Sequence, residues 1–135
     1  MIEVKAKIRF ITEATGPVEA EISDEHSPKT FKALIEALPF ESTAYRWGDE
    51  VYFETPIEVP EENAQETVDK GTVAYWPPGN SLCIFWGPTP ASRSPEEIRP
   101  ASPVNILGKI IGDPSVFSKV RSGDKIKVEL VERGE

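Results

Sequence analysis

Apolar and charged residues alternate along the first part of the chain. Between Ile2 and Phe10 every second residue is apolar, and each residue between them is charged. A period of two sustained in this way predicts a β-strand with one face in the core and the other in water. A Gly-Pro pair follows, and the alternation resumes over residues 18–22, so the two segments should form a hairpin.

A helical period replaces this alternation after Ser27. Ser27 suits the N-cap of a helix, and Pro28 suits its first turn. Apolar residues then recur at helical spacing until Pro39 interrupts the pattern; they are Phe31, Leu34, Ile35 and Leu38. We expect a helix that lays this apolar stripe across the sheet.

Further segments have the pattern of strands, and they cover residues 42–47, 50–54, 72–76, 81–86, 104–111 and 125–131. A short turn of helix is expected near residues 62–68 and a short helical segment at 114–120. Closing eight antiparallel strands removes the exposed edges that an open sheet would leave. The chain therefore predicts one domain over residues 1–135, mainly β: a closed or nearly closed eight-stranded antiparallel β-barrel with two short helices.

The segment from Leu82 to Trp86 is apolar at every position, which is typical of a strand covered on both faces. One face belongs to the core, and the other must meet the helix or line a pocket. The connection that follows, residues 87–103, contains five prolines and should be a long loop without regular structure. Long ordered loops are often functional.

Composition argues against several classes of partner. The 15 Lys and Arg against 23 Asp and Glu give a formal charge of −8, whereas nucleic-acid binding needs cationic patches. The longest apolar stretch, residues 73–88, is interrupted by Pro77-Pro78-Gly79-Asn80 and is shorter than the roughly 20 residues that span a bilayer. With no membrane span and no signal peptide expected, the protein should be cytoplasmic. The single cysteine and single histidine predict no disulfide, no metal site and no cofactor.

Four segments together carry a resemblance to a known fold. They are 47–53 (Trp-Gly-Asp-Glu-Val-Tyr-Phe), 73–79 (Val-Ala-Tyr-Trp-Pro-Pro-Gly), 83–92 (Cys-Ile-Phe-Trp-Gly-Pro-Thr-Pro-Ala-Ser) and 102–108 (Ser-Pro-Val-Asn-Ile-Leu-Gly). With the order of elements, they resemble the cyclophilin fold, and more closely the small prokaryotic cyclophilin-like domains of uncharacterised function. The helix start Pro28-Lys29-Thr30 is also similar to that of true cyclophilins.

The resemblance implies where an active site would lie. Cyclophilin enzymes isomerise the bond before proline, using an arginine that weakens amide resonance beside an apolar pocket. The comparable residue here is Arg46, between Tyr45 and Trp47. The enzymes' Ser-Gln-Phe-Phe segment becomes residues 81–85 here and lacks the glutamine, and their later histidine is replaced near Pro103. The alternative role for Arg46 is a surface pair with a neighbouring carboxylate.

Aromatic residues of two neighbouring strands are the main candidates for ligand binding. Alternation sends Tyr75 opposite to Trp76 and Phe85 opposite to Trp86, so one of each pair should face the core. The other two, together with Tyr52, could form a platform for a proline-containing peptide or a small apolar ligand. The alternative is that they pack against the predicted helix.

Three polar residues of the proline-rich loop, Thr89, Ser92 and Arg93, could bind an anionic or peptide group. The alternative is local turn hydrogen bonds.

Other polar residues have a simpler interpretation. The acidic pairs Asp49-Glu50, Glu61-Glu62 and Glu96-Glu97 are expected to be solvated, because neighbours on a strand point to opposite faces. His26 should be an exposed loop residue, and Cys83 should be a small core residue with nothing nearby to activate it.

Three functions remain as hypotheses. The first is a ligand- or peptide-binding domain without a complete isomerase site. The second is a peptidyl-prolyl cis-trans isomerase that uses Arg46. The third is a non-catalytic subunit of a larger enzyme complex.

Overall fold

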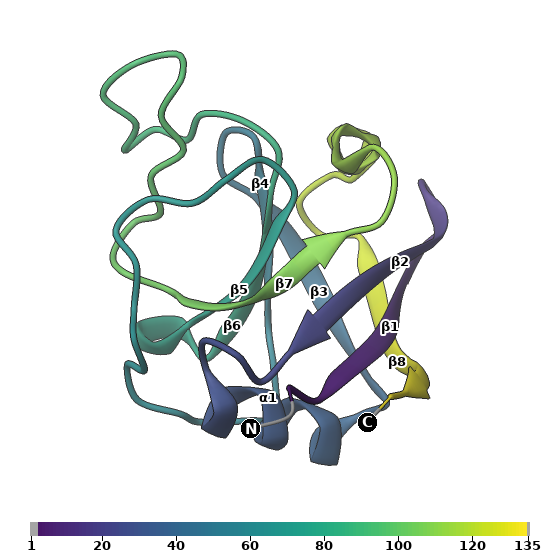
Figure 1. Cartoon of the computed structure of the whole chain (residues 1–135). Helices are drawn as coiled ribbons and strands as arrows, with labels where there is room; N and C mark the ends of the chain where they lie inside the picture. Colours follow the sequence, from purple (N-terminus) through teal and green to yellow (C-terminus); the bar gives the residue numbers. More distant parts are fainter. Residues whose placement is uncertain (1–2, 135) are drawn as a thin grey trace.

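Eight antiparallel strands form a closed barrel in the computed structural model, which describes residues 3–134 (Figure 1). The strands are β1 Lys5–Thr12, β2 Gly16–Ser23, β3 Phe40–Arg46, β4 Glu50–Glu54, β5 Thr72–Trp76, β6 Ser81–Phe85, β7 Asn105–Ile110 and β8 Lys125–Arg133. Around the barrel they follow the order β1-β2-β7-β5-β6-β4-β3-β8, and β8 pairs with β1 to close it. The predicted fold class is therefore confirmed.

Three short helical elements accompany the strands: α1 Pro28–Ala37 and the 3-10 helices η1 Pro77–Gly79 and η2 Pro114–Lys119. Neither end of the barrel is open, because α1 lies at one end and η2 at the other (Figure 1). Phe31 and Leu34 of α1 are buried in the same core cluster as the inward residues of the strands. At the other end, Phe117 of η2 meets Phe10 edge to face, with ring centroids 6.1 Å apart. Within residues 3–134, no helix is long and apolar enough to cross a membrane.

Two details of the sequence-based prediction need correction. The expected turn of helix near 62–68 is wrong: this stretch is irregular, and Gln65 forms an isolated antiparallel bridge with Val104. Pairing with a distant segment satisfies the backbone there, so no local helix is needed. The expected first strand began at Ile2, which lies outside the described residues, and β1 begins at Lys5.

The N-terminus of α1 is capped from a distant part of the chain. Ser27 occupies the N-cap position but makes no side-chain capping bond. Instead, the Glu62 carboxylate accepts hydrogen bonds from the backbone N–H groups of Lys29 and Thr30, both at 2.9 Å, and from the Thr30 hydroxyl at 2.8 Å. Partial burial of Glu62 raises its pKa, but these hydrogen bonds outweigh it and leave the pKa below the ordinary value. Glu62 is thus a capping residue, not a solvated surface charge.

Candidate functional site

The outer face of three neighbouring strands is apolar. β6 lies between β4 and β5, and its Cys83 is opposite Tyr52 on one side and Ala74 on the other. These three residues point away from the barrel interior, because side chains alternate between the two faces of a strand. Phe85 and Trp76 belong to the same outer cluster. A second apolar surface therefore lies outside the barrel.

The proline-rich segment 87–104 covers part of this surface. Its Ile98 and Val104 are buried in the same cluster. The Trp76 indole Nε1–H donates to the Ser102 hydroxyl oxygen at 2.7 Å, which joins the strand to the covering segment. In Figure 1 this segment is the long blue-green to green connection between β6 and β7.

A partly enclosed cavity of about 250 Å³, which we call the cup, remains between the outer face and the covering segment. Its lining consists of Trp47, Glu50, Tyr52, Trp76, Cys83, Pro100, Ala101 and Val104. Apart from Glu50, these side chains offer mainly aromatic or apolar surface. The cup thus has the character of a small-ligand pocket, in which a few polar groups are placed among apolar walls.

Glu50 is the one carboxylate in the cup lining. It begins β4 on the outward face and is only 5% exposed. Burial raises its pKa from the ordinary value of 4.5 to about 7, although a hydrogen bond with Cys83 acts in the opposite direction. Among residues 3–134 no cation pairs with Glu50. The expectation that Glu50 is a solvated surface charge is therefore wrong, because segment 87–104 covers the face on which it lies.

Cys83 is buried, as expected, but it contacts this carboxyl group. Burial raises the pKa of its thiol well above the ordinary value, and both the charge of Glu50 and the hydrogen bond to Glu50 act in the same direction. The thiol therefore stays protonated and serves as a weak donor to the carboxylate. Such a cysteine is not a nucleophile at neutral pH.

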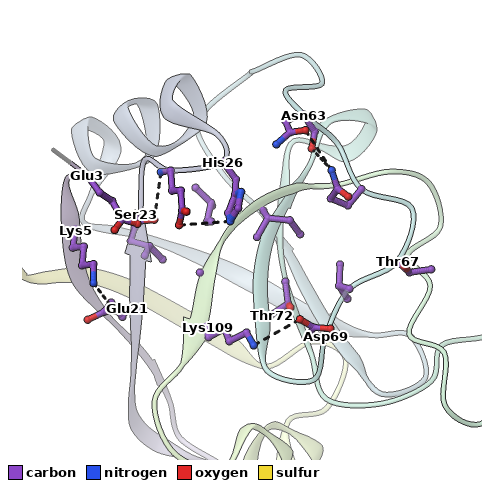
Figure 2. Close-up of a pocket in the computed structure, with 17 residues that line it drawn as sticks. Glu3, Lys5, Glu21, Ser23, His26, Asn63, Thr67, Asp69, Thr72 and Lys109 are labelled. Carbon is purple, nitrogen blue, oxygen red and sulfur yellow. Dashed lines mark hydrogen bonds and ion pairs between the residues drawn. The ribbon is translucent and has the colours of Figure 1, made fainter. Parts of the chain in front are cut away.

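A larger hollow of about 630 Å³, the groove, lies where segment 63–69 passes β2 and β7. Figure 2 shows that charged side chains around it pair with one another, Lys5 with Glu21 at 3.9 Å and Lys109 with Asp69 at 3.8 Å. All four are more than half exposed, and exposed ion pairs contribute little free energy. His26 also lines the groove and is exposed, as expected. The charges of the groove thus pair with one another in water, whereas the cup holds a buried carboxyl group that no ion pair among residues 3–134 includes, so the cup is the better candidate site.

Arg46 lies at the end of β3 and is not part of the cup lining. Its guanidinium donates to the carbonyl oxygens of Gly48 at 3.0 Å, Ser118 at 3.0 Å and Val120 at 3.3 Å. It also stacks over the ring of Trp86, 5.0 Å from the centroid. These contacts hold the β3–β4 turn against the end of η2 and the residue that follows it. The catalytic role of Arg46 stays a prediction.

The four predicted aromatic residues divide between the two apolar clusters as the alternation requires. Tyr75 and Trp86 belong to the barrel core, and Trp76 and Phe85 belong to the outer cluster. The outward pair meets segment 87–104 and not the helix. Of the predicted ligand-binding residues, Trp76 and Tyr52 line the cup, whereas Phe85 lies fully buried beside it.

The three polar residues of the loop are engaged in local hydrogen bonds. The Thr89 hydroxyl donates to the carbonyl oxygen of Arg99. The Ser92 hydroxyl oxygen accepts from the backbone N–H groups of Thr89 at 3.0 Å and Arg99 at 3.2 Å. Arg93 pairs with Glu97 at 3.1 Å. These bonds brace the segment that covers the cup, so their contribution to the cup is indirect.

Sequence reasoning did not single out Trp47, Pro100, Ala101 and Val104 as pocket residues. A usable signal existed for Glu50, because it shares the strand face of Tyr52, two residues along. Once Tyr52 was a candidate, period-two alternation pointed to Glu50 as its neighbour. The remaining residues are brought in by the path of segment 87–104, which has no periodic pattern to follow.

Comparison with known proteins agrees with the barrel. The model of the cyclophilin-like family matches residues 6–129. No curated protein matches the chain in sequence. Among solved structures, the solution structure of the hypothetical protein AF2241 from Archaeoglobus fulgidus is similar, with 41% identity and a TM-score of 0.81. The similarity covers 94% of this chain and 95% of that one. Because the family model spans nearly the whole closed barrel, the chain belongs to the cyclophilin-like family.

Proposed function

We propose that the protein is a binding domain that holds a small ligand, or one side chain of a short peptide, in the cup. The observation that carries the proposal is a partly enclosed, mainly apolar cavity with one buried carboxyl group in its lining. Burial of an ionisable group costs free energy unless it is paired, and such groups cluster at functional sites.

The size of the cup limits what it can hold. At about 250 Å³ it is smaller than the roughly 300–1,000 Å³ of pockets that take drug-sized molecules. It therefore suits one compact group, with the rest of a larger ligand extending over the open rim. Ala101 is exposed at this rim, so a ligand reaches the cup without unfolding of the covering segment.

An isomerase would need a guanidinium that is free to donate to the prolyl amide. The donors of Arg46 are already directed at backbone carbonyl oxygens, and none of the cup-lining residues is an arginine. The binding proposal does not depend on Arg46. The binding proposal is therefore favoured over the hypothesis of a prolyl isomerase.

A ligand screen observed by ¹⁵N NMR tests the proposal. The panel should contain small organic molecules and short Xaa-Pro peptides. The chain has three tryptophans, and the indole N–H signals of Trp47 and Trp76 report on the cup, whereas Trp86 lies in the barrel core. A ligand in the cup should shift the first two signals more than the third.

Matched variants decide whether binding occurs in the cup. Ala101→Phe places a large side chain at the rim and should abolish binding. Ser94→Phe, at an exposed position of the same segment outside the cup lining, should leave binding unchanged. Binding that survives Ala101→Phe, or a panel in which no member shifts the cup signals, would overturn the proposal.

A further inference from the structure

The cup combines three aromatic side chains with a carboxyl group. Trp47, Tyr52 and Trp76 line it together with Glu50. The faces of aromatic rings carry negative potential and attract cations. No lysine or arginine is among the lining residues. Both kinds of side chain thus favour an occupant with positive charge.

Glu50 has no counter-ion within the described chain. At 5% exposure it is shielded from water, and no ion pair of the described residues includes it. A buried carboxylate without a counter-ion is costly even when a thiol donates to it, and a cation of suitable shape would lower that cost. The cysteine thiol beside it is a weak donor and cannot supply a positive charge.

We propose that the cup binds an organic ammonium group, with Glu50 as the counter-ion and the three aromatic side chains as walls. The inference rests on the proposed function and names the chemistry of the ligand. Methyl groups on the nitrogen make the apolar contacts that the rest of the lining offers. The small volume of the cup suits such a headgroup.

Glu50 is the group that makes this binding pH-dependent near neutrality. The other titratable side chains in the lining are Tyr52 on the same strand and Cys83 on β6. The thiol pKa lies well above its ordinary value. Trp76 on β5 and the lining residues of the covering segment, Pro100, Ala101 and Val104, do not titrate. Asp49 precedes Glu50 but lies against Gly87, outside the lining.

Choline and its neutral isostere 3,3-dimethyl-1-butanol are the probes. They have nearly the same shape and differ in the positive charge, and neither titrates in this pH range. Affinity is measured by isothermal titration and by the indole signals of Trp47 and Trp76. At pH 8 choline should bind at least about tenfold more tightly than 3,3-dimethyl-1-butanol, since a desolvated cation–π contact alone can supply such a factor.

The pH dependence identifies the counter-ion. Between pH 8 and pH 5.5 the affinity for choline should fall roughly 30-fold, because a carboxyl group with a pKa of about 7 must lose its proton before the cation binds. Glu50→Gln should weaken choline binding at pH 8 and remove the pH dependence. Glu54→Gln, at the exposed end of the same strand, should change neither.

The outcomes separate this inference from the proposed function. If the neutral isostere binds in the cup as tightly as choline, the ammonium inference is overturned and the binding proposal stands. The ammonium inference is also overturned if choline binding to the Glu50→Gln variant keeps its pH dependence. If neither probe binds and the wider panel shifts no cup signal, both proposals fail. The comparison of the two probes uses the wild-type protein, so the test does not depend on the folding of any variant.

Discussion

Replacing Glu50 by glutamine should stabilise the protein at pH 8 relative to wild type and have much less effect near pH 4.5. The side chain is buried, and burial raises its pKa from 4.5 to about 7. Glutamine keeps the shape of the side chain but cannot ionise. The substitution therefore removes the cost of burying a negative charge without opening a cavity.

The sign and size of the effect follow from proton linkage. Between pH 4.5 and 7 the unfolded chain releases the Glu50 proton while the folded chain retains it. At this group the folded state binds more protons in this range, so the contribution of Glu50 to wild-type stability falls as pH rises. A rise from 4.5 to about 7 corresponds to about 3 kcal/mol at about 1.4 kcal/mol per pH unit. The full difference is present above pH 7.

Urea unfolding followed by tryptophan fluorescence measures this difference at several pH values between 4.5 and 8.5. The free energy of unfolding of Glu50→Gln minus that of wild type should increase by about 3 kcal/mol across the range. Glu54→Gln is the control, because Glu54 is exposed on the same strand and its replacement should give a profile parallel to wild type. A flat difference for Glu50→Gln would refute the argument that Glu50 is buried without a counter-ion.

Three other substitutions or reactions test parts of the structure. Glu62→Ala should lower the free energy of unfolding by about 1–3 kcal/mol at pH 7, since it removes three hydrogen bonds to the N-terminus of α1. Hydrogen exchange should also accelerate at the Lys29 and Thr30 amides. This difference should shrink as the pH falls below the ordinary pKa of glutamate. It should disappear below the lowered pKa of Glu62, where the carboxylate is protonated in the folded state as well. Arg46→Met should lower stability by about 1–2 kcal/mol in urea unfolding, because it removes the hydrogen bonds to the Gly48, Ser118 and Val120 carbonyl oxygens, of which only the last is partly buried. An unchanged midpoint would contradict this bracing role. Cys83 should react with a thiol reagent only on unfolding, because its side chain is buried and its thiol pKa is raised. Rapid labelling of the native protein would contradict the assignment of Cys83 as a buried, protonated thiol.

Most of the barrel could be predicted from local pattern. β4 and β5 have the predicted bounds, and the other strands differ by a few residues at their ends. The assignment of Tyr75 and Trp86 to one face and Trp76 and Phe85 to the other follows from the same alternation. These features are predictable because the side-chain period of a strand is a local geometric property, and burial of one face imposes it on the sequence.

The site depended on contacts between segments far apart in the chain. Glu50 is buried because segment 87–104 covers its side of β4, and Glu62 caps a helix more than thirty residues before it. In the sequence, each of these residues is one half of an acidic pair that looks no different from a pair exposed to solvent. The sequence by itself determined the strands, their inward faces and the closed barrel, since these follow from periodicity. Only the tertiary structure decided which carboxylates leave water, because the path of an irregular segment is set by long-range packing and hydrogen bonds that no local pattern encodes.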